Sequence, residues 1–307
     1  MRLSALDFFS NPRESLALAA LAEELGFHRY WIGEHHTRYQ CANPLMLASL
    51  IAGRTKSIRL GTGATSVMLR NPYLTAEDAR MAQFVLGDRL DLGVAPVTAL
   101  KEDVFRAIVE SPETRGNYVR RARELHGYVT GKLDSAARTN SLYLEQGPPM
   151  WILGMSRDSA DLAGELGLGF CTSFHHGATA SSVIDAFSHY ESSFKRSERF
   201  DRPTKVIVVS GVCGDTEAHC ALRRKAVAAA AGNMWTREFE FYGRPNECAD
   251  QIHGIATRVH ADEVMVLSLA MNDIVETNGE IYQGLAEAWK GRSGARITRR
   301  AHDLSSG

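Results

Sequence analysis

Two histidines and a glutamate stand together at Glu34-His35-His36, directly after the apolar segment 30–33. An imidazole exchanges a proton near neutral pH, and a neighbouring carboxylate can orient the ring or accept a proton itself. The pattern makes His35 and Glu34 the candidate catalytic residues. On residue types alone, a purely structural role for the tripeptide is equally consistent.

A run of small residues follows at Gly61-Thr62-Gly63-Ala64-Thr65-Ser66, where the third apolar segment ends. Small side chains allow a flat aromatic ring to approach the backbone closely, so Gly63 and Ala64 are candidate cofactor contacts. The alternative is a glycine-rich bend at a corner of the sheet. A phosphate loop is not expected, because the lysine of that motif is missing.

A candidate phosphate site lies at Gly154-Met155-Ser156-Arg157-Asp158-Ser159, where a short apolar segment meets a helical one. The free N–H groups and the positive end of a helix dipole favour an anion there. The Ser156 and Ser159 hydroxyls and the N–H group of Met155 add donors, and Arg157 adds a cation. The alternatives are that Ser156 only caps the helix and that Arg157 is solvated.

Ser173-Phe174-His175-His176 ends a further apolar segment, which gives the chain two pairs of adjacent histidines. Adjacent residues of a strand point to opposite faces, so each pair offers one inward ligand. No His-x-His or His-Glu-x-x-His motif completes a metal-binding set. We therefore expect no metal site, and we take Ser173 as a cofactor contact only through the resemblance described below.

Strand-like and helix-like segments alternate along the whole chain, and alternation of this kind predicts parallel strands. Eight such pairs predict an α/β fold that closes into a single (β/α)₈ TIM-type barrel with insertions. Asn-Pro precedes three of the helices, at residues 11–12, 43–44 and 71–72, and predicts capped helix starts. The predicted pairs are 3–9 with 12–25, 30–35 with 44–55, 58–68 with 72–86, 89–94 with 113–130, 150–154 with 158–166, 170–173 with 180–196, 206–212 with 216–231, and 263–269 with 273–289.

The barrel is expected to span residues 1–291, with a loosely ordered tail at 292–307. Segments 97–112, 134–148 and 232–244 are expected to be loops or insertions. The last of these holds Trp235, Phe239 and Phe241, and we expect it to pack over the barrel mouth as a lid.

The composition is that of a globular protein with a large core: 307 residues, 44% hydrophobic and 23% charged. A formal net charge of −1 gives no reason to expect a nucleic acid or an anionic membrane as partner. We expect a cytoplasmic protein, since we find no signal peptide or apolar span. Five cysteines without CxxC spacing are expected to be reduced core residues.

In their order and spacing, these motifs resemble the bacterial-luciferase-like flavin-dependent monooxygenases. The resemblance covers roughly residues 1–290. The motifs that carry it are Tyr30-Trp31-Ile32-Gly33-Glu34-His35-His36, Ile58-Arg59-Leu60-Gly61-Thr62-Gly63, Trp151-Ile152-Leu153-Gly154-Met155-Ser156 and Gly243-Arg244-Pro245-Asn246-Glu247-Cys248.

The resemblance implies reduced FMN (FMNH₂) at the carboxyl end of the barrel. It implies a cis peptide bond at Gly63–Ala64 beneath the flavin ring, and a serine contact from Ser173. It places the phosphate on Met155, Ser156 and Ser159. It places His35 near the reaction centre, where proton transfer accompanies formation and reaction of a C4a-peroxyflavin.

One departure from the family pattern concerns the phosphate. After the fourth strand the luciferases carry an arginine that helps to hold it, whereas this chain has Ala95-Pro96-Val97. Loss of a charged contact removes on the order of 1.5–3 kcal/mol of binding. Three outcomes are open: another residue such as Arg157 substitutes, the flavin binds weakly and transiently, or the barrel has lost flavin binding.

The expected activity is oxidation of a small organic substrate by O₂ and FMNH₂, with the FMNH₂ supplied by a separate flavin reductase. A deazaflavin-dependent oxidoreductase of the same superfamily is one alternative, although such members more often have Asp-His where this chain has Glu34-His35. A non-catalytic flavin-binding or partner barrel is the other. The pattern specifies no substrate.

The resemblance also implies a homodimer formed through helices of the early units. The candidate helices are those containing Ala17, Ala19, Ala20 and Ala22, and Leu47, Ala48 and Leu50. Packing against the barrel core explains these apolar residues equally well.

Overall fold

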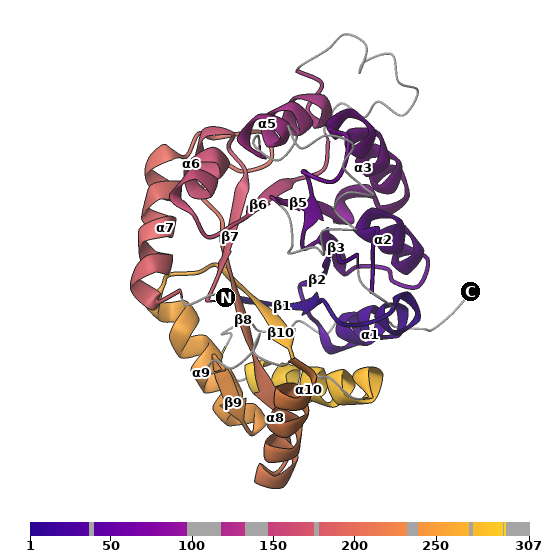
Figure 1. The fold of residues 1–307 in the computed structure, drawn as a ribbon, viewed down its shortest axis with the longest axis vertical. Coiled ribbons are helices and arrows are strands. Elements are labelled where there is room, and N and C mark those ends of the chain that lie inside the picture. The colour runs from indigo at the N-terminus through magenta and orange to yellow at the C-terminus, as the bar shows by residue number, and fades with distance from the viewer. Residues whose placement is uncertain are drawn as a thin grey trace, which may run out of the picture.

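The computed structural model describes residues 1–36, 40–96, 118–132, 147–174, 178–231, 239–269, 273–290 and 292. Eight parallel strands close into a barrel, because the last of them pairs with both the first and the seventh (Figure 1). The predicted (β/α)₈ barrel is therefore confirmed. In order around the barrel the strands are β1 (Arg2–Asp7), β2 (Arg29–Ile32), β3 (Arg59–Thr62), β5 (Leu90–Ala95), β6 (Met150–Leu153), β7 (Gly169–Ser173), β8 (Lys205–Cys213) and β10 (Glu263–Ser268).

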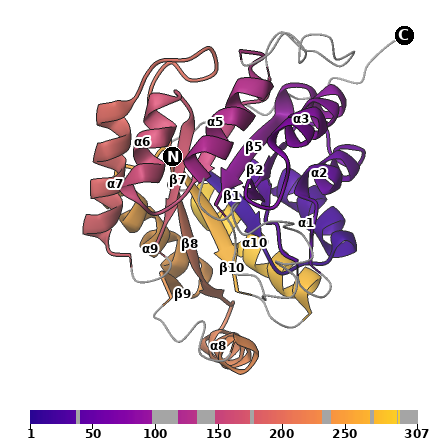
Figure 2. The same cartoon turned by 45° about the horizontal axis from the view of Figure 1, so that its top comes forward.

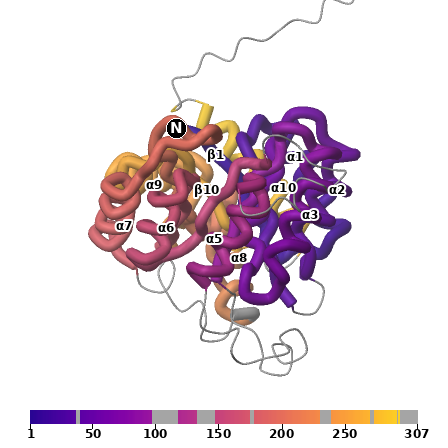
Figure 3. The backbone as a smooth tube through the Cα atoms, turned by 90° about the horizontal axis from the view of Figure 1, so that it is seen from above, coloured from indigo at the N-terminus to yellow at the C-terminus, as the bar shows by residue number. Residues whose placement is uncertain are grey.

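Helices surround this barrel on all sides, as the tilted cartoon and the tube view also show (Figures 2 and 3). The described α-helices are α1 (Pro12–Leu25), α2 (Pro44–Ala52), α3 (Pro72–Leu86), α5 (Tyr118–Val129), α6 (Arg157–Glu165), α7 (Ala180–Ser193), α8 (Glu217–Ala231), α9 (Pro245–Arg258) and α10 (Ile274–Lys290). Helix α8 stands outside the ring that the others form (Figure 1). None of the helices in the described ranges is long and apolar enough to cross a bilayer.

The Asn-Pro motifs cap the first three helices, as the sequence predicts. The Asn11 side chain accepts from the N–H groups of Arg13 and Glu14, and the Glu14 carboxylate accepts from the Asn11 N–H, which completes a capping box. Asn43 and Asn71 accept from N–H groups in the first turns of α2 and α3. Each asparagine thus satisfies donors that the helix itself leaves free.

Two short strands were not predicted as separate elements. The predicted strand 58–68 is divided: β3 ends at Thr62, and β4 (Thr65–Ser66) pairs separately with β5. The expected loop 232–244 contains β9 (Phe241–Gly243), which pairs with the end of β8. Phe241 is fully buried in the core, so it is not part of a lid, and Trp235 lies outside the described residues.

Side chains on alternate strand positions fill the barrel interior. Trp31 and Trp151 meet edge to face there, with 5.7 Å between their ring centroids. A Cβ atom on Gly61 would collide with the Trp31 ring, and one on Gly169 with the Trp151 ring. Gly61 therefore makes room for a tryptophan. The five cysteines are free and buried, as predicted.

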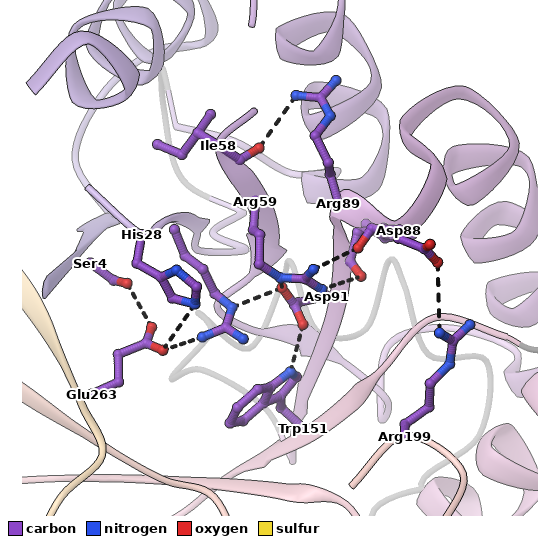
Figure 4. A network of polar contacts seen from close by, with 12 residues as sticks. Ser4, His28, Ile58, Arg59, Asp88, Arg89, Asp91, Trp151, Arg199 and Glu263 are labelled. Carbon is purple, nitrogen blue, oxygen red and sulfur yellow. Dashed lines mark hydrogen bonds and ion pairs between the residues drawn. The ribbon is translucent and has the colours of Figure 1, made fainter. Parts of the chain in front are cut away.

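A buried ionic network closes the amino-terminal end of the barrel (Figure 4). Asp91 accepts hydrogen bonds from Arg29 Nε at 2.9 Å, Arg59 Nε at 2.7 Å and Trp151 Nε1 at 2.9 Å. Arg29 also pairs with Glu263, which accepts a hydrogen bond from Ser4. Burial alone would raise the pKa of Asp91, but the two arginines hold it below its ordinary value.

Candidate active site

A pocket of about 440 Å³ opens at the carboxyl ends of the strands, the end at which TIM barrels carry their active sites. Its walls come from loops after several different strands and from the start of α6. The lining residues are Leu6, Phe8, Glu34, Gly63, Ala64, Ser66, Ala95, Pro96, Leu153, Gly154, Met155, Ser156, Ser159, Cys171, Thr172, Ser173 and Val208.

The predicted ring contacts Gly63 and Ala64 line this pocket, and the peptide bond between them is cis, as expected. A Cβ atom on residue 63 would lie 3.0 Å from both Leu6 Cδ1 and Trp31 Cβ. Because residue 63 is a glycine, its backbone can pack directly against these two interior side chains.

Glu34 lines the pocket but is engaged in holding the surrounding loops. Its side chain is buried, with Oε1 2.8 Å from His36 Nε2 and Oε2 3.2 Å from Arg70 Nε. The N–H group of Ser66 also donates to Oε2, and the N–H group of Glu34 donates to the Ala64 carbonyl. These bonds tie the end of β2 to the segment that contains the cis peptide. The geometry therefore suits Glu34 to positioning this segment.

His35 lies beside the pocket and is not among its lining residues. Its ring meets the lining residue Phe8 edge to face, with 4.8 Å between centroids. Burial lowers the pKa of His35 below its ordinary value, and repulsion from His36 lowers it further. His35 Nε2 is buried and has no hydrogen-bond partner among the described residues. A neutral imidazole with a free ring nitrogen can accept a proton or a hydrogen bond.

The start of α6 forms the second end of the pocket, where the sequence predicts a phosphate. Ser156 caps the helix by accepting from the Ser159 N–H at 3.2 Å, and its own hydroxyl donates to Ser159 Oγ at 3.1 Å. A Cβ atom on Gly154 would lie 2.5 Å from Ser159 Oγ, so the glycine allows that hydroxyl to reach the end of β6. Ser156 is therefore the helix cap, and its single hydroxyl proton is directed at Ser159.

Arg157 points away from this end of the pocket. Its guanidinium pairs with Asp185 of α7 at 3.0 Å, and its side chain is 65% exposed. Ala95 is the last residue of β5 and Pro96 follows it, and both line the pocket. None of the described lining residues is lysine, arginine or histidine, so the donors that the described residues offer to an anion here are neutral.

Residues 3–294 match the family model described as luciferase-like monooxygenase. The chain belongs to this family. It is 31% identical to YwcH of Bacillus subtilis (strain 168) over 212 residues, and this match covers 67% of this chain and 63% of YwcH. The luciferase-like monooxygenase of Escherichia coli (strain K12) is 29% identical over 222 residues, 69% of this chain and 63% of that protein. The matches thus span slightly less than two thirds of the length of these curated relatives.

Solved structures agree with the family assignment. Apo-MsnO8 superimposes with a TM-score of 0.77 at 26% identity, covering 94% of this chain and 98% of MsnO8. A type II Baeyer–Villiger monooxygenase in complex with FMN (TM-score 0.67) and an F420-dependent secondary alcohol dehydrogenase (TM-score 0.65) share the fold at 15% identity. The fold is therefore found with either class of coenzyme.

Several residues that line the pocket carry no motif and were not predicted from the sequence. Phe8 follows β1, and its ring covers Gly33, where a Cβ atom would collide with it. Thr172 and Cys171 precede the predicted contact Ser173, which does line the pocket. Burial raises the pKa of the Cys171 thiol, which therefore stays protonated. Because alternate residues of a strand face the same side, the alternation along β7 could have identified Cys171 as an inward-facing residue. His175 and His176 lie outside the described residues.

Proposed function

We propose that this luciferase-like monooxygenase takes FMNH₂ from a separate reductase and uses O₂ to oxidise a small organic substrate. The observation that carries the proposal is a pocket lined by the small residues Gly63 and Ala64 and by hydrogen-bond donors at the start of α6. A flat isoalloxazine ring can pack against the small residues, and a phosphate suits the donors. Overall, one oxygen atom enters the substrate, the other forms water, and FMNH₂ becomes FMN.

Each predicted site residue except Arg157, which pairs with Asp185 outside the pocket, then has a role. The N–H groups of Met155 and Ser156 and the hydroxyl of Ser159 would hold the phosphate, and Ser173 would contact the flavin. Glu34 would position the Gly63–Ala64 segment through its bonds to Arg70 and Ser66. A bound FMNH₂ would supply two electrons for the activation of O₂.

His35 is the residue we propose for proton transfer. Its lowered pKa leaves the imidazole neutral at pH 7, and Nε2 is open to a proton or a ligand group. The contact with Phe8 fixes the ring against a pocket wall. A neutral base in this position would accept and return one proton in each turnover.

We also propose that the protein forms a homodimer through one face of α2 and α3. Four of the seven residues predicted for such an interface are core residues. Ala19, Ala22, Leu47 and Ala48 are buried, Ala20 is half-buried, and Ala17 and Leu50 are exposed. The exposed apolar face consists of Met46, Leu50, Leu74, Met81, Phe84 and Val85, each more than half exposed. An apolar face of this kind is typical of a protein contact, and a second copy would bury the same face on both subunits.

Anaerobic titration with FMNH₂, followed by addition of O₂, tests the proposed function. Tight binding and O₂ consumption that depends on an added organic substrate would support it, and NADH alone should cause no O₂ uptake. Preference for a deazaflavin coenzyme, or flavin binding without oxygen chemistry, would each contradict it. Candidate substrates to screen are aldehydes and carrier-bound acyl groups.

His35→Ala tests the proton-transfer role. The variant should keep its thermal midpoint within a few degrees, since the substitution lies outside the main core. Its O₂-dependent turnover should fall by roughly 10²-fold, the usual scale for loss of an acid–base group. His219→Ala, on the exposed side of α8, is the matched control and should behave as wild type. Equal turnover in the His35 variant would remove that residue from the mechanism.

A further inference from the structure

Tyr118, the first residue of α5, has a buried hydroxyl to which the function proposed above gives no role. Among the described residues this oxygen has no hydrogen-bond partner of standard geometry. It lies beside the side chain of Ser159, and burial raises the pKa of Tyr118 to about 12 although this neighbour lowers it. The phenol therefore keeps its proton at any physiological pH. A buried donor without a partner is unfavourable, so a state in which it donates is favoured.

The topology places the two residues together. Helices α5 and α6 belong to consecutive barrel units, and both start at the carboxyl end of the barrel. An ion pair between Arg123 and Glu165 joins the same two helices further along their length. Tyr118 and Ser159 thus occupy the first turns of two neighbouring helices. Ser159 lines the pocket, whereas Tyr118 is not among the lining residues. Tyr118 would therefore contact Ser159 on the side away from the pocket.

The hydrogen bonds around Ser159 leave the proton of its own hydroxyl group without an assigned acceptor. A serine hydroxyl has a single proton to donate and two lone pairs that accept. Ser159 Oγ already accepts from the Ser156 hydroxyl, which itself accepts from the Ser159 N–H. If Tyr118 donates to the second lone pair, both acceptor positions of Ser159 Oγ are filled. The one remaining proton must then point elsewhere, and the open side of Ser159 is the pocket.

We propose that Tyr118 is a positioning residue that donates to Ser159 Oγ and so directs the Ser159 proton at the flavin phosphate. This inference rests on the proposed function. It explains how a phosphate site can operate with no cation among the described lining residues. Neutral donors that polarise one another in series are stronger than isolated ones. Selectivity for FMN over riboflavin would then depend on a pair of hydroxyl groups.

Dissociation constants for FMN and riboflavin, measured by quenching of flavin fluorescence, test this proposal. Tyr118→Phe removes only the hydroxyl and should weaken FMN binding by roughly threefold to tenfold while riboflavin binding stays unchanged. In a Ser159→Ala background the same change should have no further effect, because the hydroxyl acts through Ser159. Tyr128→Phe, near the other end of α5, is the matched control and should change neither constant.

Four outcomes would overturn the inference. Tyr118→Phe could bind FMN as tightly as wild type, or it could lose FMN and riboflavin equally, as a change in pocket shape would. Its effect could instead persist in full in the Ser159→Ala background. If Tyr118→Phe fails to fold, Ser159→Ala is tested alone, and unchanged FMN binding there would refute the proposal. A wild-type protein that binds neither these flavins nor FMNH₂ in the anaerobic titration would instead refute the proposed function itself, which separates the two failures.

Discussion

Asp91→Asn tests the role of the ionic network at the amino-terminal end of the barrel. Asp91 is fully buried and is the shared acceptor of Arg29, Arg59 and Trp151 (Figure 4). The four charged groups Arg29, Arg59, Asp91 and Glu263 balance to zero. An asparagine keeps the size of the side chain but removes one negative charge, which leaves a net positive charge among buried groups. Glu263 compensates only in part, because its carboxylate already pairs with Arg29.

Breaking a buried pair by removing one partner costs about 3–5 kcal/mol, since the remaining charge stays buried without compensation. In a barrel of this size each kcal/mol lowers the thermal midpoint by about 2 °C, so the midpoint should fall by roughly 6–10 °C. Urea unfolding followed by circular dichroism gives the free energy directly. FMN binding by the folded variant should be unchanged, because the network lies at the end of the barrel opposite the pocket.

Asp88→Asn is the matched control for this experiment. The Asp88 side chain is 90% exposed and lies 3.7 Å from Arg199, so its loss should cost less than about 0.5 kcal/mol. If Asp91→Asn also costs less than about 1 kcal/mol, the network contributes no more than a surface ion pair. The reasoning that the barrel is held closed by charge at this end would then be wrong.

Three further changes test other parts of the structure. Arg157→Ala should leave the FMN dissociation constant within about twofold, since the guanidinium pairs with Asp185 on the surface; a loss of tenfold or more would make Arg157 the phosphate ligand. Burial, followed by repulsion from nearby cations, lowers the pKa of His126 from 6.5 to about 4, so protonation favours the unfolded chain. The free energy of unfolding should therefore fall as the pH drops through this range, by up to about 1.4 kcal/mol per pH unit. Urea unfolding at pH 7, 6 and 5 should show a smaller dependence on pH for His126→Gln than for wild type. An equal dependence in the two proteins would contradict this. Phe84→Lys should convert a dimer to a monomer in light scattering, and an unchanged mass would exclude the α3 face as the interface.

The sequence predicts the elements well where a local cause determines them. Asn11-Pro12 caps α1 because the asparagine oxygen and the proline ring act within one helical turn. The apolar run along Val206–Val212 predicts β8, since a barrel strand is buried on both faces, one toward the interior and the other toward the helices. The order of these elements was enough to predict the barrel. The same local reasoning located His35 and Ser159 at strand and helix ends.

Contacts between distant residues could not be predicted in the same way. From its sequence context, Gly61 is either space for a cofactor or part of a bend. Only the structure shows that Trp31 of the neighbouring strand β2 fills that space. The bond between Arg29 and Asp91 joins residues 62 positions apart, and neither lies in a motif. β9 is three residues long, and its pairing with β8 decides its conformation more than its own sequence does.

Each strand thus divides its residues between two tasks. In β5, Asp91 near the start of the strand belongs to the ionic network, whereas Ala95 at the end lines the pocket. In β2, Arg29 contributes to the network, and Glu34 and His35 follow the end of the strand. The two layers are separated by the Trp31–Trp151 pair, which fills the barrel between them. A substitution at the mouth, such as one at Ala95, can therefore change ligand binding while the packing that closes the barrel stays intact.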